Sequence, residues 1–283
     1  MNARRLMIML GAAGIAALAG FPKFSLADES IVLASTTSTQ DSGLYDYLLP
    51  IFTDRTGIAV KIVAQGTGQA LDTARRGDVD AVLVHAEAAE KQFIADGDGV
   101  KRYPVMYDDF VLVGPSADPA GVFGKTDILR AFQALHDRHA AFISRGDRSG
   151  THVAELGYWQ AAGIDIERDK GPWYRAVGQG MGAALNMASA SNAYLLSDRP
   201  TWLAFGNKGD LKILLEGDAR LFNQYSVILV NPAKHPAVKK ELAQRFIDYL
   251  VSSDGQRDIG LYKISGQQAY HPDAQGIERQ HLR

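Results

Sequence analysis

The residues best suited to chemistry form the turn Ser144–Thr151, which reads SRGDRSGT. The turn follows an apolar run, Ala140–Ile143, and leads into a helix-like segment, His152–Trp159. A strand that ends in such a turn and opens a helix presents free backbone N–H groups at the positive end of the helix dipole, which favours an anion. Arg145 adds a permanent charge with forked donors, and the last residues of the turn add hydroxyl donors. The turn therefore predicts a site for a negatively charged, oxygen-rich ligand.

Three more turns rich in glycine or hydroxyl residues lie between a predicted strand and a predicted helix. They are Ser35–Thr39 (STTST), Gln65–Gln69 (QGTGQ) and Gly178–Gly182 (GQGMG). Each alone is more typical of an ordinary helix N-cap or tight turn. Because the four turns are shared between both halves of the chain, their N–H and O–H donors are expected to converge. Such a convergent set suits a small tetrahedral oxyanion.

Metal binding is the first rival interpretation. His152 and Glu155 are three residues apart and share a helical face, as two metal ligands would. No second histidine at ligand spacing accompanies them, and a capped helix start explains Glu155 as well. We therefore expect no metal cation.

Catalysis is the second rival. Ser144 and Ser149 lack the turn pattern that surrounds a hydrolase nucleophile. Asp108 and Asp109 could pair as acid and base, but they sit in a long extended stretch. We expect them to hydrogen-bond to the backbone or to meet Arg145 instead, and we expect no enzyme.

Short apolar runs alternate with amphipathic stretches in the first part of the chain. This alternation favours right-handed βαβ units and a mostly parallel sheet. The predicted strands are 31–34, 59–63 and 81–84, and the predicted helices are 44–52 and 69–76.

Two long extended stretches, 103–115 and 223–232, interrupt this rhythm, and a helical segment at 235–251 follows the second. They suggest an α/β fold of two lobes joined by a two-stranded hinge, with the ligand in the cleft between them. The first lobe would comprise residues 28–108 plus 226–283, and the second 109–225. A single α/β domain with two long antiparallel strands remains the alternative.

The N-terminus reads as a cleaved signal peptide, residues 1–27. Arg4 and Arg5 precede the apolar run 6–21, and Ser25-Leu26-Ala27 offers a cleavage site after Ala27. A transmembrane anchor is the alternative, but this run is shorter than the roughly 20 residues that span a bilayer. The pattern predicts a periplasmic protein, exported by either the general or the twin-arginine route.

Charge argues against nucleic acid and anionic membranes as partners, and the cysteine content excludes disulfides and thiolate sites. Residues 1–27 carry three basic residues and no acidic one, so their removal lowers the formal net charge from −2 to −5. An acidic chain is a poor candidate for binding nucleic acid or an anionic membrane. With no cysteine, the chain has no disulfide and no thiolate site.

Several short motifs occur in order along the chain: STTS at 35–38, DSGL at 41–44, GTGQAL at 66–71, SRGDRSGTH at 144–152, GMG at 180–182, YLLSDR at 194–199 and RLFN at 220–223. In these motifs the chain resembles the tungstate-binding proteins of bacterial ABC uptake systems. The family's usual Thr-Thr-Thr-Ser stretch begins here with Ser35, which keeps the hydroxyl group.

The resemblance implies a type II periplasmic-binding-protein fold, in which two α/β lobes close on a dehydrated oxyanion and present it to a membrane permease. It implies a monomer that needs no cofactor. The residues implied as ligand-binding are Thr36, Thr37, Ser38 and Thr67 in the first lobe, with Arg145, Ser149, Thr151 and the N–H groups of Met181 and Gly182 in the second.

Other functions stay open at this point. A sister oxyanion, namely molybdate, phosphate or sulfate, would use the same kind of site, and tungstate and molybdate are nearly identical in size and charge. Phosphate would want an acceptor facing it, for which Asp147 is the candidate, although a capping role suits that residue better. A secreted hydrolase or a sensor on the same fold is the alternative from another class.

Overall fold

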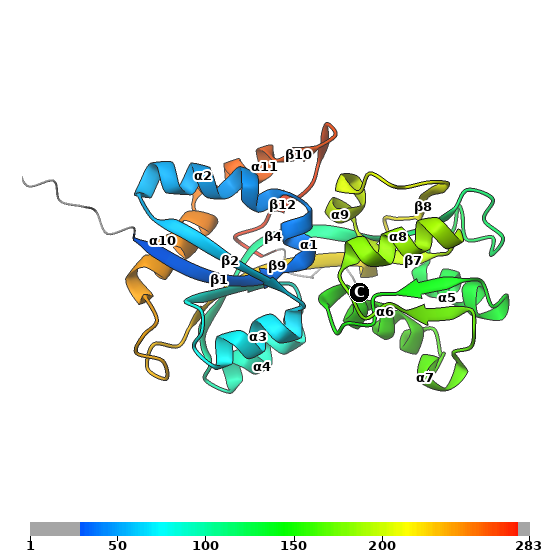
Figure 1. Cartoon of the computed structure of the whole chain (residues 1–283), viewed down its shortest axis with the longest axis horizontal. Coiled ribbons are helices and arrows are strands. Elements are labelled where there is room, and N and C mark those ends of the chain that lie inside the picture. Colours follow the sequence, from blue (N-terminus) through cyan, green and yellow to red (C-terminus); the bar gives the residue numbers. More distant parts are fainter. Residues whose placement is uncertain (1–28, 277–283) are drawn as a thin grey trace, which may run out of the picture.

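The computed structural model describes residues 29–276 and places them in two α/β lobes that lie side by side (Figure 1). Each lobe has its own hydrophobic core. The core of the first lobe draws on residues 31–106 and 225–270, whereas the second lobe holds two clusters from residues 110–221. Separate cores favour two lobes over one continuous domain. The predicted boundaries at residues 108, 109, 225 and 226 stay a prediction, and the predicted signal peptide lies outside the described residues.

The first lobe is built from three parallel strands with helices packed around them. Its elements are β1 (Ser30–Thr36), α1 (Thr37–Asp41), α2 (Leu44–Thr56), β2 (Ala59–Gln65), α3 (Thr67–Arg75), β3 (Ala81–Val84), α4 (Glu87–Ala95), α10 (Lys240–Val251), α11 (Ser253–Leu261) and the short strands β10 (Lys263–Ile264), β11 (Gln267–Gln268) and β12 (His271–Pro272).

The second lobe repeats the alternation of strand and helix with shorter strands. Its elements are α5 (Ile128–Asp137), β5 (Phe142–Ser144), α6 (Gly150–Ala161), α7 (Ile166–Asp169), β6 (Tyr174–Ala176), α8 (Met181–Ser191), β7 (Leu195–Asp198), α9 (Arg199–Ala204), β8 (Leu211–Leu215) and the 3₁₀ turn η1 (Ala219–Leu221).

Two long strands, β4 (Gly99–Pro115) and β9 (Phe222–Val230), connect the lobes (Figure 1). They pair with each other in antiparallel register, with Asp108 opposite Asn223. In the first lobe β9 also pairs with β3, and in the second lobe β4 pairs with β7 and β8. The α/β class and the two-stranded hinge that the sequence predicts are therefore confirmed.

The expectation of a mostly parallel sheet is wrong. Pairing is parallel between β1 and its neighbours β2 and β3, and between β5 and β6, but β9 is antiparallel to β3 and β4. The reason is the hinge: one strand carries the chain out to the second lobe and the other brings it back. Strands with opposite directions can pair only antiparallel.

The predicted helices exist, with shifted starts. The helix expected from residue 235 begins at Lys240, because residues 231–239 form turns in which Asn231 O accepts from the N–H groups of Lys234 and His235. The helix expected from residue 69 begins earlier, at Thr67, because the Gln69 side chain caps Gly66 N at 3.3 Å. A hydrophobic pattern fixes a helix's interior better than its ends.

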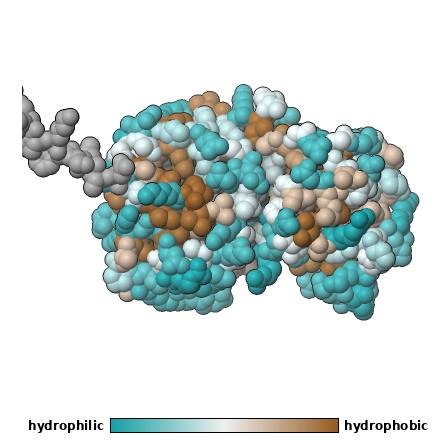
Figure 2. Space-filling view, viewed as in Figure 1, coloured by the Kyte–Doolittle hydropathy of each residue, from teal (hydrophilic) through white to brown (hydrophobic). Residues whose placement is uncertain are grey.

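The sheet is not equally buried along its width. β2 is the edge strand, and its side chains are mostly only partly buried. On the face drawn in Figure 2, hydrophobic residues gather over β1 and β2, whereas hydrophilic residues cover most of the outline. Strands β1 and β3 are better buried than β2.

Asp80 ties the first lobe together directly before β3. Its carboxylate accepts hydrogen bonds from Val32 N at 2.7 Å and from Lys239 N at 2.8 Å, and the residue is buried. One carboxylate therefore satisfies backbone donors in the central strand and in the segment that opens α10. Buried N–H groups without partners are costly, so this residue is part of the sheet's support.

Replacing Asp80 should destabilise the fold without touching the cleft. We expect Asp80→Ala to lower the free energy of unfolding by about 2–4 kcal/mol, because two backbone donors lose their acceptor. Asp80→Asn, which keeps one acceptor oxygen, should cost less. Urea denaturation followed by circular dichroism measures both values, and an unchanged midpoint for Asp80→Ala would contradict this role.

Candidate ligand-binding site

The four turns predicted from the sequence lie where the two lobes face each other. Thr36 is the N-cap of α1 and Gly66 the N-cap of α3 in the first lobe, whereas Ser149 caps α6 and Gly180 precedes α8 in the second. The lobes touch here, because Arg145 Nη2 donates to Thr37 Oγ1 at 3.3 Å across the cleft. The turns that carry the predicted residues are thus brought together in the cleft between the lobes.

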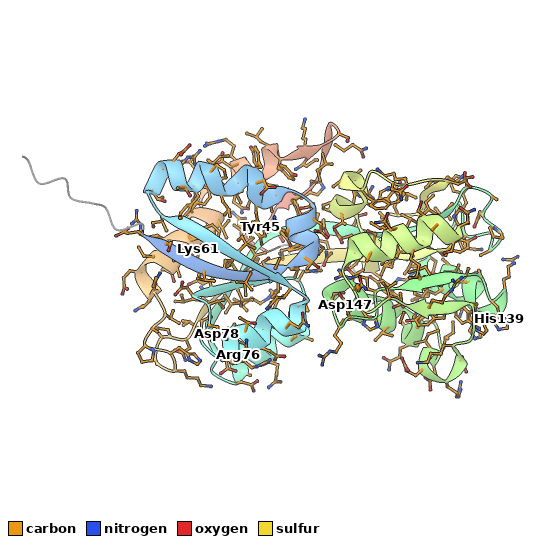
Figure 3. All side chains as sticks on the ribbon, viewed as in Figure 1. Tyr45, Lys61, Arg76, Asp78, His139 and Asp147 are labelled. Atoms are coloured by element: carbon orange, nitrogen blue, oxygen red, sulfur yellow. The ribbon has the colours of Figure 1, made fainter. Side chains whose placement is uncertain are left out.

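Arg145 is the central charged residue of the cleft, with only 2% of its surface exposed. Its Nη2 donates to Asp147 Oδ2 at 2.6 Å as well as to Thr37, while its Nε is buried and has no hydrogen-bond partner among the described residues. Asp147 lies at the boundary between the lobes (Figure 3). The next residue, Gly146, has a φ of 65°, and a Cβ there would lie 2.7 Å from the Cβ of Ala176. Glycine therefore allows the sharp turn that directs the arginine inward.

Two threonine hydroxyls, like Arg145 Nε, are buried donors without a hydrogen-bond partner among the described residues. Thr67 Oγ1, at the first residue of α3, and Thr151 Oγ1, in the first turn of α6, are both buried, and neither has a hydrogen-bond partner within residues 29–276. Buried polar groups are nearly always satisfied, so unpaired donors indicate a functional site. We call Thr67 Oγ1, Thr151 Oγ1 and Arg145 Nε the donor set; it draws on both lobes.

The hydroxyl cluster of the first turn is largely satisfied by itself. Thr36 Oγ1 lies 3.2 Å from Ser38 Oγ and 2.7 Å from Thr39 Oγ1, and it also accepts from Thr39 N at 3.3 Å. Thr36 and Ser38 are buried, and Thr37 makes the contact with Arg145. These residues stiffen the start of α1 where it meets the second lobe.

The remaining predicted residues belong to the second lobe. Ser149 Oγ accepts from His152 N at 3.2 Å and so acts as a helix cap. The Met181 side chain is buried in the core, which leaves its backbone N–H toward the cleft end of α8, beside Gly182. A cavity of about 200 Å³ opens here; it is lined by Thr37, Ala64, Gln65, Gly66, Gln69, Asp147, Gly178, Gln179 and Gly180.

A buried polar chain that sequence reasoning missed lies at the hinge. Asn223 Nδ2 donates to Asp108 Oδ1 at 2.6 Å, and Asn223 Oδ1 lies 2.9 Å from His85 Nδ1. Burial, together with the nearby Asp198, raises the pKa of Asp108 well above its ordinary value, and burial lowers the pKa of His85. The sequence does show a polar residue in or next to each of three apolar strands: His85 after β3, Asp108 in β4 and Asn223 in β9.

The expectation for the two hinge aspartates is wrong. Asp108 bonds to Asn223 and Tyr225 rather than to the backbone or Arg145, and Asp109 forms a two-pronged ion pair with Arg199 at 2.6 and 2.7 Å. Adjacent residues of a strand point to opposite faces, so the two carboxylates cannot meet the same partner.

The His152–Glu155 pair does not form a metal site. His152 Nδ1 accepts from Arg148 N, whereas Glu155 Oε1 accepts from Trp159 Nε1 at 3.1 Å and from Tyr174 OH at 2.7 Å. Glu155 therefore belongs to the core and not to a helix cap. No group of histidine and acidic side chains in the described part of the chain is arranged to hold a metal ion.

Comparison with known proteins agrees with this geometry. Residues 25–254 match the family model described as the PBP superfamily domain. The tungstate-binding protein TupA of Peptoclostridium acidaminophilum is 48% identical over 235 residues, which covers 82% of this chain and 81% of the relative. The chain belongs to the family of tungstate-binding proteins within the PBP superfamily.

Solved structures of tungstate-binding proteins share the fold. The structure described as the tungstate ABC transporter from Geobacter sulfurreducens is 49% identical with a TM-score of 0.77, and the match covers 83% of this chain and 100% of that one. TupA from Desulfovibrio alaskensis G20 is 44% identical with a TM-score of 0.74, over 87% of this chain and 99% of that one. Between residues 29 and 276, none of the helices has the length and apolar character needed to cross a bilayer.

Glu155, in α6 beside the cleft, makes the stability of the protein depend on pH. Burial raises its pKa from 4.5 to about 7, although the hydrogen bond from Tyr174 opposes the shift. Between these values the folded protein holds a proton that the unfolded chain has lost. The stability that Glu155 contributes is thus fully present below pH 4.5 and is lost as the pH rises to about 7.

Glu155→Gln should remove this dependence, because glutamine cannot ionise and its Oε1 can accept both hydrogen bonds. We expect the variant to gain about 1–3 kcal/mol of unfolding free energy, relative to the parent, between pH 5 and pH 8. Urea unfolding at the two pH values measures the change. Equal pH slopes in the two proteins would show that Glu155 does not carry it.

Proposed function

We propose that this protein binds tungstate in its cleft and delivers it to the membrane permease of an ABC importer. The observation that carries the proposal is the donor set, since three buried donors from two lobes lack partners within the described chain. Membership of the tungstate-binding family supports the same ligand. Molybdate is the sister ligand that the geometry admits equally well.

The cage has a defined composition in this proposal. Thr67 donates from the first lobe, with Thr36, Thr37 and Ser38 beside it at the start of α1. Arg145 and Thr151 donate from the second lobe, with Ser149 and the N–H groups of Met181 and Gly182 completing the wall. The proposed cage contains no metal cation and needs no cofactor.

The electrostatics favour a dianion. An oxyanion that leaves water loses a large hydration free energy, which neutral hydrogen bonds restore only in part. Arg145 supplies a buried positive charge, and charge-assisted hydrogen bonds are roughly twice as strong as neutral ones. Lobe closure excludes water, which strengthens these bonds further.

We further propose that the protein is not an enzyme. A hydrolase needs a serine activated by a base, but Ser149 Oγ accepts a backbone N–H as a helix cap, and His152 Nδ1 accepts another. The protein is proposed to act as a periplasmic monomer, exported by the signal peptide predicted at residues 1–27.

Arg145 should dominate the affinity. We expect Arg145→Ala to weaken tungstate binding by about 2–5 kcal/mol, by analogy with truncating one member of a buried charge pair. Arg145→Lys should recover only part of this loss, because an ammonium group cannot present the fork. Isothermal titration with tungstate, molybdate, sulfate and phosphate measures the series. A folded Arg145→Ala protein that binds tungstate as tightly as the parent would place the site elsewhere.

Thr151 should contribute less, since it supplies one neutral donor. Thr151→Val is nearly isosteric and should weaken binding by about 1–3 kcal/mol. The matched control is Ser191→Ala, in the same lobe, whose hydroxyl bonds to Met187 O within α8. Titration should show a loss for the first variant and none for the second; equal effects would argue against a direct contact.

A further inference from the structure

One close approach of the two lobes is between His85 and Gly150. His85 directly follows β3 in the first lobe, and Gly150 opens α6 in the second. A Cβ placed on Gly150 would lie 2.6 Å from His85 Cε1 and 2.8 Å from Nδ1. Real side-chain atoms do not approach so closely, so the backbone of α6 rests directly against the imidazole ring.

Other glycines at the interface leave more room. A Cβ on Gly66 would lie 3.4 Å from Asp147 O, one on Gly68 3.9 Å from Arg148 O, and one on Gly180 3.6 Å from Thr37 Oγ1. These are ordinary van der Waals distances. Of these four glycines, Gly150 alone makes a contact that admits no extra atom.

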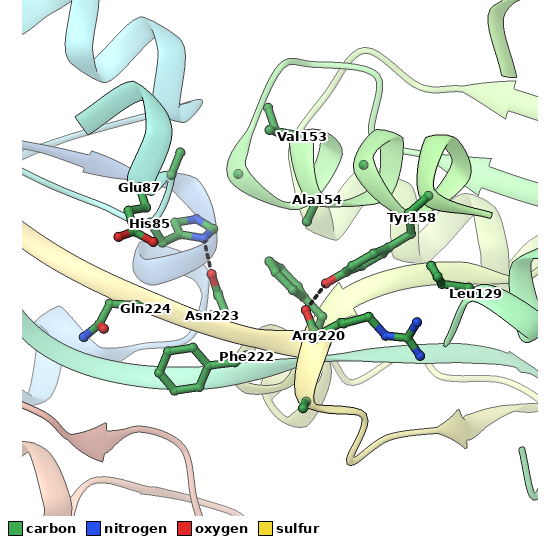
Figure 4. A pocket seen from close by; sticks show the side chains of 16 residues that line it. His85, Glu87, Leu129, Val153, Ala154, Tyr158, Arg220, Phe222, Asn223 and Gln224 are labelled. Atoms are coloured by element: carbon green, nitrogen blue, oxygen red, sulfur yellow. Dashed lines mark hydrogen bonds between the residues drawn. The ribbon is translucent and has the colours of Figure 1, made fainter. Parts of the chain in front are cut away.

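The His85 ring is held rigidly by the hinge. It stacks on Tyr225 with ring centroids 4.6 Å apart. Its Nδ1 bonds to Asn223 Oδ1 at 2.9 Å, as Figure 4 shows. The Asn223 amide is oriented in turn, because its Nδ2 must donate to the Asp108 carboxylate and its oxygen then faces His85. Both partners belong to β9, so the ring is fixed to a hinge strand and cannot move aside freely.

The contact also adjoins the donor set. Thr151, whose hydroxyl belongs to that set, follows Gly150 directly, and the Ser149 cap precedes it. Any displacement of α6 against His85 therefore moves the donors of the second lobe relative to Thr67 in the first. The distance between the two halves of the cage therefore depends on how closely α6 approaches His85.

We propose that the His85 ring and the bare backbone of Gly150 form a mechanical stop that sets how far the lobes close and thereby the size of oxyanion that the cage fits. This inference rests on the proposed function and adds a specificity-determining residue to it. Sulfate and phosphate are smaller tetrahedra than tungstate. The stop keeps the two lobes too far apart to grip them, because the ring and the α6 backbone are already in contact and cannot move closer around a smaller ion.

The first test enlarges the stop. Gly150→Ala adds one methyl group where there is no space, yet alanine is a better helix former than glycine and Gly150 has no positive φ. The second lobe should stay folded while closure is prevented, and tungstate affinity should fall about tenfold or more. Gly157→Ala is the matched control in the same helix, because nothing lies within 4 Å of its Cβ. It should bind as the parent does.

The second test removes the stop. His85→Ala should let the lobes close further, so the ratio of tungstate to sulfate affinity should fall about tenfold. In the His85→Ala background the Gly150→Ala methyl group has room, so its penalty should shrink to less than about twofold. This coupling separates a stop from a mere loss of stability, which thermal unfolding of each variant monitors.

Isothermal titration with tungstate and with sulfate gives the answer for the parent, the two single variants, the double variant and the Gly157→Ala control. An unchanged affinity ratio in His85→Ala, or an equal Gly150→Ala penalty in both backgrounds, would overturn the stop. A parent protein that binds neither ion would instead overturn the proposed function. The two failures are therefore distinguishable.

Discussion

β4 and β9 run in opposite directions between the lobes, and this antiparallel pair sets how the two halves of the cleft face each other. In the first lobe β9 is also hydrogen-bonded to β3, and in the second lobe β4 is hydrogen-bonded to β7 and β8. Two strands resist sliding along each other but bend readily, so the lobes can change their angle while the register stays fixed. The register in turn keeps Asp108 opposite Asn223 and so orients the ring of His85.

The cleft contains buried polar groups whose desolvation destabilises the fold, and the rest of the structure must offset this free energy. Two buried hydroxyls and a guanidinium nitrogen without partners destabilise the closed form of the protein by themselves. Three other residues of the turns are, by contrast, satisfied: Thr36, Ser38 and Ser149 all act within local hydrogen-bond networks. A rigid frame around unsatisfied donors is what electrostatic preorganisation requires, because the donors need not reorient when charge arrives.

Turn chemistry was the part of the site that could be predicted from the sequence. Arg145 and Thr151 were identified because one turn between a strand and a helix combines an arginine with glycine and hydroxyl residues, whereas Thr67 followed from the resemblance to the tungstate-binding proteins. The strand and helix centres followed from apolar periodicity. The hinge polar chain could not be predicted in this way. His85 and Asn223 are 138 residues apart and meet only through strand pairing, which also made the mostly parallel sheet a wrong expectation. Local patterns carry no information on which distant strands become neighbours.

The ion pair between Arg145 and Asp147 bears on how quickly cargo is handed over. Asp147 accepts from Arg145 Nη2 at 2.6 Å and from Ser149 N at 3.1 Å, so its negative charge partly compensates the guanidinium, whose Nε has no partner among the described residues. An arginine that had no such carboxylate beside it would be left as an isolated buried charge whenever the cleft emptied, and departure of the anion would be correspondingly slow. Asp147 provides an ion-pair partner for Arg145 when no anion is bound. Asp147 therefore lowers the affinity for the anion and shortens its residence time. A shorter residence time suits a binding protein that must release its ligand.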